Sequence, residues 1–116
     1  MIFDNSLFTI PALTGAIFVL VGIIMLKFPP KNINSLYGYR TNSAMKSKER
    51  WIYAQNYSAK EFIKLGGILA LSGLIGLFIQ PNENVATGIG LGLMILTITA
   101  LIVRVEKAIK EKFGKD

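Results

Sequence analysis

LFTIPALTGAIFVLVGIIML, residues 7–26, is an apolar stretch that contains no charged side chain. It is as long as the roughly 20 residues with which an α-helix crosses the hydrocarbon core of a bilayer. A secretory signal peptide would carry a basic region before such a run and a small-residue cleavage site after it. Here Asp4 is the only charged residue before the run, and Lys27-Phe28-Pro29-Pro30 follows it. We therefore expect a retained membrane helix.

Two further apolar runs follow in the second half of the chain. They are LGGILALSGLIGLFI at residues 65–79 and VATGIGLGLMILTITALIV at residues 85–103. The first of these is short for a span, but Phe62-Ile63-Lys64 extends it, because a lysine can snorkel to the membrane surface. The sequence thus predicts an all-α integral membrane bundle of three transmembrane helices in a single domain, residues 1–116, with spans at about 7–26, 62–79 and 85–103.

The positions of the basic residues predict how this bundle is oriented. Eight of the 13 lysines and arginines lie between the first and second apolar runs, mostly in a loop at residues 27–61, and the other five lie in a tail at residues 104–116. The N-terminal segment and the connector at residues 80–84 have none. By the positive-inside rule, we predict a multi-pass protein of the bacterial inner membrane with its N-terminus outside and its C-terminus in the cytoplasm.

Several chemistries are excluded by residue types that the chain lacks. It has no cysteine and no histidine, which excludes disulfides, thiol nucleophiles, Ser-His catalysis and the usual zinc sites. No acidic residue falls in the middle of a predicted span, so a proton relay there has no carrier. We predict no metal and no cofactor. The net charge of +6 comes without a nucleic-acid-binding motif, so we expect it to face a bilayer with anionic headgroups and no nucleic acid.

Glycines recur inside the apolar runs at helical spacing. Two pairs are seven residues apart and so share a helix face, and a third pair has GxxxG spacing: Gly15 with Gly22, Gly66 with Gly73, and Gly88 with Gly92. Small residues let helices approach closely in lipid, where no hydrophobic force drives them together. The glycines therefore predict packing within one three-helix bundle or a homo-oligomer seam, and the sequence leaves both open.

The polar loop at residues 27–61 carries the most specific residues of the chain. Pro30 helps to end the first helix, and Asn34 favours a turn. Gly38 offers a positive φ or a close approach of the backbone. Arg40 could hold a phosphate or carboxylate bidentately, or it could pair with a lipid phosphate or a nearby glutamate and only pin the loop. Charge placement leaves both roles open.

A helix is predicted to begin within this loop near Ser47. Serine is a favourable N-cap, and Glu49 in the first turn complements the positive end of the helix. Nothing interrupts the pattern before the second span, so we expect an amphipathic helix that leads into that span. Trp51 has two interpretations: it anchors the chain at the membrane interface, or it packs with Asn56 against the turn at residues 38–40 and builds a pocket.

The residues of the loop and of this helix form a recognisable motif. It consists of PPKNINSLYGYRT at residues 29–41, SAMKS at residues 43–47, Trp51, and AQNY at residues 54–57. The motif resembles that of the SdpI family of small bacterial multi-pass membrane proteins, and the resemblance covers essentially the whole chain. The motif and candidate ligand-binding residues are Pro30, Asn34, Tyr37, Gly38, Tyr39, Arg40, Thr41, Ser43, Glu49, Trp51 and Asn56.

The resemblance implies an immunity protein. Such a protein would protect the cell against a secreted killing peptide, and the implied partners are a peptide toxin or a cytoplasmic regulator. Our first hypothesis is therefore an antimicrobial-peptide resistance protein, without enzymatic activity, that works and signals through the turn at residues 38–40 and the helix of Trp51.

Two other hypotheses stay open. One is a small membrane enzyme that acts on a lipid headgroup or peptide at the inner leaflet. Arg40 would hold the anion, and acid–base candidates would be Tyr37, Tyr39, Glu49 and Lys46. This hypothesis requires a cavity that holds Arg40 together with a convergent acid. The other is a structural protein whose loop only folds back on the bundle.

Overall fold

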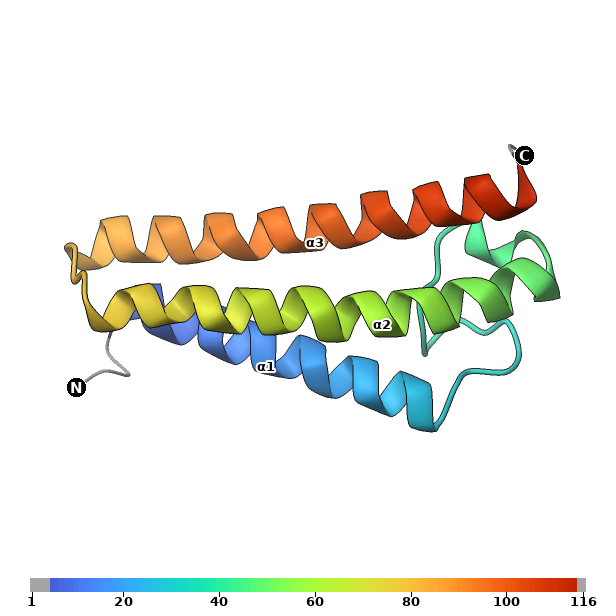
Figure 1. Cartoon of the computed structure of the whole chain (residues 1–116), viewed down its shortest axis with the longest axis horizontal. Helices are drawn as coiled ribbons and strands as arrows, with labels where there is room; N and C mark the ends of the chain where they lie inside the picture. Colours follow the sequence, from blue (N-terminus) through green and yellow to red (C-terminus); the bar gives the residue numbers. More distant parts are fainter. Residues whose placement is uncertain (1–4, 115–116) are drawn as a thin grey trace.

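The computed structural model describes residues 5–114, and it is helical over most of that range. Three long helices run side by side: α1 (Ser6–Lys27), α2 (Lys48–Ser72) and α3 (Glu83–Phe113) (Figure 1). No strand occurs among these described residues, so the predicted all-α architecture of three helices is confirmed. Asp4 and the last two residues of the predicted tail lie outside the described residues.

Each long helix begins at a side chain that caps it. The side-chain oxygens of Asn5, Ser47 and Asn82 accept hydrogen bonds from backbone N–H groups in the first turns of α1, α2 and α3. Such caps pair N–H groups that have no partner inside the helix. The predicted start of a helix at Ser47 is thus confirmed, and α2 runs from the polar loop into the apolar region without a break.

Two of the three helices are long and apolar enough to cross a membrane, namely α1 and α3. With 22 residues, α1 extends about 33 Å at 1.5 Å per residue, close to the thickness of a hydrocarbon core. The predicted second span at residues 62–79 combines two elements, the apolar end of α2 and the 3₁₀ helix η3 (Gly73–Leu77). The predicted third span continues as one helix through most of the tail to Phe113.

The glycines hold α1 against α2. A Cβ atom added at Gly15 would lie 2.5 Å from the backbone oxygen of Gly66 and 2.5 Å from the backbone nitrogen of Ala70. Gly22 meets α2 in the same way at Ala59. Packing within the bundle is therefore the role of these glycines. The predicted GxxxG pair is different, because nothing lies within 4 Å of a Cβ atom at Gly88 or Gly92.

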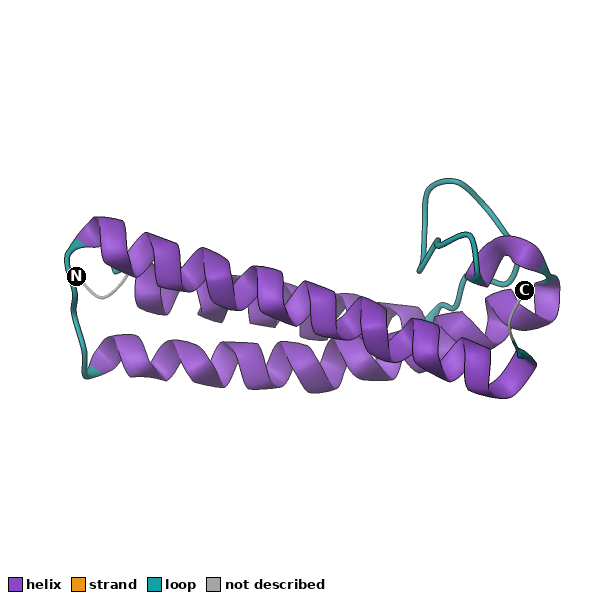
Figure 2. Cartoon of the chain, turned by 90° about the horizontal axis from the view of Figure 1, so that it is seen from above, coloured by secondary structure: helices purple, strands orange, loops and turns teal. Residues whose placement is uncertain are grey.

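The two ends of the bundle differ. The connection from α1 to α2, which includes the short 3₁₀ helix η2 (Ala44–Lys46), gathers at the end where α3 finishes, and the α2–α3 connector lies at the other end (Figures 1 and 2). The buried cluster joins the loop, η2, α2 and α3, and its members are Tyr39, Ala44, Ala54, Leu101, Val105 and Ile109. Elsewhere large apolar side chains are exposed along the helices, among them Leu20 at 57% and Leu96 at 67%.

Candidate functional site

The motif turn, defined as residues 38–41, is held against α2 by the side-chain amide of Gln55. Its Nε2 donates to the backbone oxygen of Tyr39 over 2.7 Å, and its Oε1 accepts from the backbone N–H of Tyr39 over 2.6 Å. Gly38 has a φ of 106°, and Gln55 Oε1 lies against the place where a Cβ of Gly38 would be. Glycine is thus required at this position both by its backbone conformation and by the close approach of the amide.

The same turn is bound to α3 through Glu106. The hydroxyl groups of Tyr39 and Thr41 both donate to Glu106 Oε2, over 2.7 Å and 2.8 Å. Burial raises the pKa of Tyr39 above its ordinary value, and the hydrogen bond and negative charge of Glu106 raise this pKa further. The hydroxyl of Tyr39 therefore stays protonated at neutral pH and acts as a hydrogen-bond donor.

Trp51 is fully buried and fixes the first part of the loop. Its Nε1 donates to the backbone oxygen of Pro30 over 2.6 Å. The interpretation of Trp51 as an anchor at the membrane interface is therefore wrong, because its ring does not reach the surface. The alternative is correct only in that Trp51 packs beneath the loop, because its hydrogen bond goes to Pro30 and not to the turn at residues 38–40. It is wrong for Asn56. Asn56 is exposed, and the neighbouring Gln55 holds the turn instead.

Two further motif residues shape the loop from within. The side-chain oxygen of Asn34 accepts from the backbone N–H groups of Leu36 and Tyr37, over 2.9 Å and 2.7 Å. The hydroxyl of Tyr37 donates to the backbone oxygen of Phe28 over 2.6 Å, which ties the loop to the end of α1. Asn34 and Tyr37 thus serve the conformation of the loop.

Ser43 joins the short helix η2 to α2. Arg50 is buried, and its Nε donates to the backbone oxygen of Ser43 over 2.8 Å while its Nη2 donates to the Ser43 hydroxyl over 3.0 Å. The guanidinium carbon of Arg50 also lies 5.6 Å from the centre of the Phe113 ring at the end of α3. A cation in contact with an aromatic face adds to this attachment.

Arg40 is the residue of the motif turn that stays exposed. Its Nη1 donates to the backbone oxygen of Ser35 over 2.5 Å. Together with the rest of the motif turn it lines a cavity of about 360 Å³, whose other walls are apolar side chains of the three helices: Phe18, Phe62, Ile98, Leu101 and Ile102. None of the residues that line this cavity is acidic. The structure therefore places Arg40 at an apolar cavity without the convergent acid that the enzyme hypothesis requires.

Glu49 lies apart from this cavity. It is exposed and lines a separate hollow with Tyr53, Asn56 and Phe113. The structure thus brings together Gly38, Tyr39, Arg40 and Thr41 and leaves Glu49 and Asn56 elsewhere. Among residues 5–114, no group of three or more acidic, histidine or cysteine side chains is arranged to hold a metal ion.

Two residues that hold the site do not belong to the set predicted from the sequence, Gln55 and Glu106. A signal for Gln55 is present, because it lies four residues after Trp51 and so shares its buried helix face. A polar side chain on a buried face needs a partner. Glu106 gives no comparable signal, because its hydrogen bonds join residues 65 and 67 positions apart in the sequence.

Comparison with known proteins supports the resemblance seen in the sequence. The profile of the SdpI/YfhL protein family matches residues 31–105. The chain is also 43% identical over 61 residues to the uncharacterized protein YfhL of Bacillus subtilis (strain 168). That match covers 53% of this chain and 56% of the relative, so it spans little more than half of the curated protein. No solved structure matches the chain.

Proposed function

The chain belongs to the SdpI/YfhL protein family, and on this basis we propose that it is a membrane protein of the toxin-immunity type, which protects the cell against an antimicrobial peptide. We further propose that its helices cross the inner membrane three times, with the N-terminus outside and the loop inside. The peptide would meet the motif turn, which is the working surface of the protein.

The membrane placement has support from both apolar and charged residues. Large apolar side chains are exposed along α1 and α3, and such surfaces need an apolar environment. Most of the basic residues lie in the loop, in the first turns of α2 and in the last ten residues of α3, towards the loop end of the bundle, whereas Lys60 and Lys64 lie in the middle of α2. That distribution agrees with a cytoplasmic loop and tail.

The observation that carries the proposed function is the cavity beneath the motif turn. A peptide that attacks from outside meets the membrane spans first, whereas the motif turn is on the cytoplasmic side. The cavity lies between the spans and the motif turn, because side chains of the spans and Arg40 both line it. Ile98 and Ile102 in its wall are exposed, so a peptide inserted in the bilayer could enter from the side.

Arg40 has the chemistry to bind such a peptide. A guanidinium carries five N–H donors, and the hydrogen bond to Ser35 uses one of its nitrogens. The others suit a carboxylate, for example at a peptide C-terminus, in a bidentate arrangement. On the outer side of the loop, Leu36 is 90% exposed and offers a contact for a cytoplasmic regulator.

Survival of a toxin-sensitive bacterium under killing-peptide challenge tests this proposal. Cells would express the wild-type protein, Arg40→Ala or the control Lys60→Ala, which removes the same charge from an exposed position on α2. Membrane abundance would be matched among the three. We expect the wild type and Lys60→Ala to protect and Arg40→Ala to lose protection.

Two results would contradict the proposal at different levels. If Arg40→Ala protects as well as the wild type, the motif turn is not the working surface. If the inserted wild-type protein protects against none of a panel of membrane-active peptides, the immunity function itself is refuted. The enzyme alternative gains no support from the site, since Arg40 has no acidic partner in its cavity and the Tyr39 hydroxyl is engaged by Glu106.

A further inference from the structure

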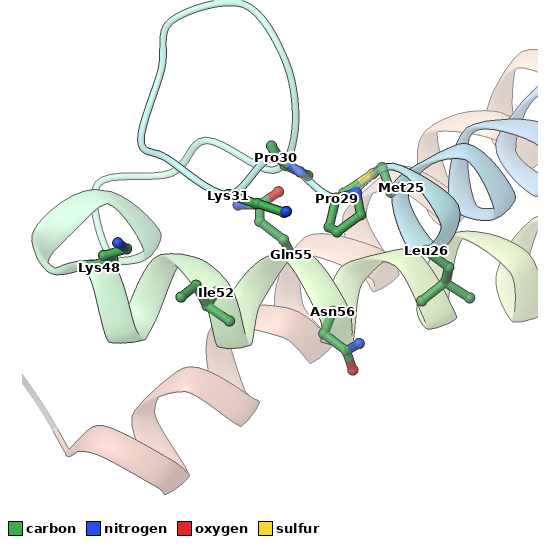
Figure 3. A pocket seen from close by; sticks show the side chains of 9 residues that line it. All are labelled: Met25, Leu26, Pro29, Pro30, Lys31, Lys48, Ile52, Gln55 and Asn56. Carbon is green, nitrogen blue, oxygen red and sulfur yellow. The ribbon is translucent and has the colours of Figure 1, made fainter.

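A separate cavity of about 370 Å³ lies where α1, the loop and α2 meet. Its walls are the last turn of α1, the Pro29-Pro30 segment and the first turns of α2 (Figure 3). It shares neither Arg40 nor any other residue of the motif turn with the cavity described above. The two cavities therefore present different chemistry to a ligand.

This second cavity combines an apolar wall with positive charge. Its apolar lining includes Met25, Leu26 and Ile52 together with the two prolines. Lys31 and Lys48 also line it. None of its lining residues is acidic, so the charge of the two amines is not balanced within the cavity. In Figure 3 the two α1 residues lie on one side of the cavity and Lys48 lies across it, at the start of α2.

The walls of this cavity are fixed by hydrogen bonds. The indole of Trp51 holds the backbone of Pro30, and the amide of Gln55 is held by the backbone of Tyr39. Both Pro30 and Gln55 line the cavity. A ligand would therefore find a formed site and would not have to order the loop, which lowers the cost of binding.

In the proposed membrane placement, the cavity lies at the level of the lipid headgroups. Met25 and Leu26 belong to the last turn of α1. The whole helix α1 is about as long as a hydrocarbon core is thick, so its last turn lies near one edge of that core. In the proposed orientation this end faces the cytoplasm. Leu26 is 41% exposed and Ile52 is 51% exposed, so the apolar wall opens towards the side of the bundle, where lipids lie.

We propose that this cavity binds an acidic phospholipid of the inner leaflet. The lipid phosphate contacts the amines of Lys31 and Lys48, and the glycerol and first acyl carbons pack against Met25, Leu26 and Ile52. A free phosphate would use the amines but would leave the apolar wall empty, and for this reason a lipid fits better. The inference rests on the membrane placement of the proposed function and is independent of the immunity activity.

Retention of lipid by the full-length protein tests this inference. The protein would be reconstituted in phosphatidylcholine vesicles that contain a minor fraction of phosphatidylglycerol, extracted in mild detergent, and analysed by native mass spectrometry. We expect phosphatidylglycerol to be retained well above its fraction in the vesicles. The double variant Lys31→Ala/Lys48→Ala should lower its apparent affinity about thirtyfold, since each of the two basic residues near an anionic surface contributes on the order of 1 kcal/mol and about 1.4 kcal/mol is tenfold in affinity.

Two further variants separate a site from general surface charge. Lys107→Ala/Lys110→Ala removes the same charge from a groove of about 730 Å³ at the same end of the molecule, which Glu106 and Glu111 also line. We expect little change with this control. Ile52→Trp keeps the charge but fills the apolar wall, and we expect it to lower phosphatidylglycerol retention as well. If the alanine variant fails to fold, Lys31→Gln/Lys48→Gln carries the same expectation.

Several outcomes would overturn the lipid site. They are equal losses in the two double-lysine variants, no preference over phosphatidylcholine, and displacement of the lipid by millimolar inorganic phosphate together with normal retention by Ile52→Trp. The last result would indicate a site for a free anion. If the wild-type protein does not stay with the vesicles at all, the membrane placement fails; if it stays without lipid preference, only the lipid site fails.

Discussion

The two halves of the bundle are held together by different forces. We call the contact of Gly15 and Gly22 with α2 the glycine seam, and we call residues 30–51, with their bonds to Gln55 and Glu106, the loop cap. In the seam, backbones touch because no side chain separates them. In the cap, buried polar groups are paired by hydrogen bonds. The seam therefore sets whether α1 and α2 associate, whereas the cap sets the shape of the loop.

The largest effect should come from placing a side chain in the glycine seam, where it would force α1 and α2 apart. Gly15→Leu places side-chain atoms where the backbones of Gly66 and Ala70 now lie, and these cannot move without separating α1 from α2. We expect a loss of about 3 kcal/mol or more in the free energy of unfolding. Thermal denaturation in detergent and abundance in the membrane would measure it.

Gly67→Leu is the matched control for this prediction. Nothing lies within 4 Å of a Cβ atom at Gly67, although the residue is next to Gly66 in the same helix. We expect its stability to stay within about 0.5 kcal/mol of the wild type or to rise slightly, because leucine favours the helix more than glycine does. Equal losses in the two variants would show that helix–helix approach is not what the seam provides.

A smaller effect is expected when the loop cap loses Gln55. Gln55→Leu keeps a similar volume but leaves the backbone N–H and C=O of Tyr39 without their partner, which should cost about 2–3 kcal/mol. Because the seam is untouched, α1 and α2 should stay together while trypsin cleaves the loop faster. Asn56→Leu, at the exposed neighbour, should leave cleavage unchanged. Similar sensitivity of both variants would mean that the cap does not depend on Gln55.

Trp51 tests the cap at a single hydrogen bond. Trp51→Phe keeps an aromatic ring but removes the donor to Pro30, and we expect a loss of about 1.5 kcal/mol. In the wild type, Trp51 is the sole tryptophan, so its fluorescence reports this position directly. We expect emission typical of a buried indole and little quenching by aqueous iodide. Strong quenching in the folded protein would contradict the buried placement.

The smallest effect concerns alkaline pH and the bond between Tyr39 and Glu106. The folded structure raises the pKa of Tyr39 above 10.0, so it favours the neutral hydroxyl. The resulting stability is fully present below pH 10 and is lost as the pH rises above 10 towards the higher pKa of the folded state. Between pH 9 and pH 11, the wild type should lose about 1 kcal/mol more than Tyr39→Phe. The two proteins differ only at this hydroxyl, so parallel stability curves would count against this role of Tyr39.

The sequence was sufficient to predict the helices and much of the seam. The apolar runs, the cap at Ser47 and the seven-residue spacing of the glycines are local patterns, and local patterns determine helix limits and faces. The GxxxG spacing could not show that this pair of α3 faces open space, because the face on which a helix packs depends on its neighbours.

The candidate site was harder to predict, because its contacts are not local. The motif points to Asn56, but the neighbouring Gln55 faces the turn, since adjacent residues of a helix point in different directions. The contact between Tyr39 and Glu106 joins parts of the chain that no spacing rule relates. The exposure of Arg40 and the burial of Trp51 likewise depend on where the loop folds back, which composition does not determine.

The fit between Gln55 and Gly38 has a consequence for how such chains can evolve. Gly38 has no room for a side chain because the amide of Gln55 occupies the space, and Gln55 keeps its place because the turn gives it two partners. Either residue changed alone would damage the other's environment. The pair should therefore be inherited as a unit: descendants that replace the glutamine should also tend to replace the glycine, and a covariation between these two positions would record the contact across the family.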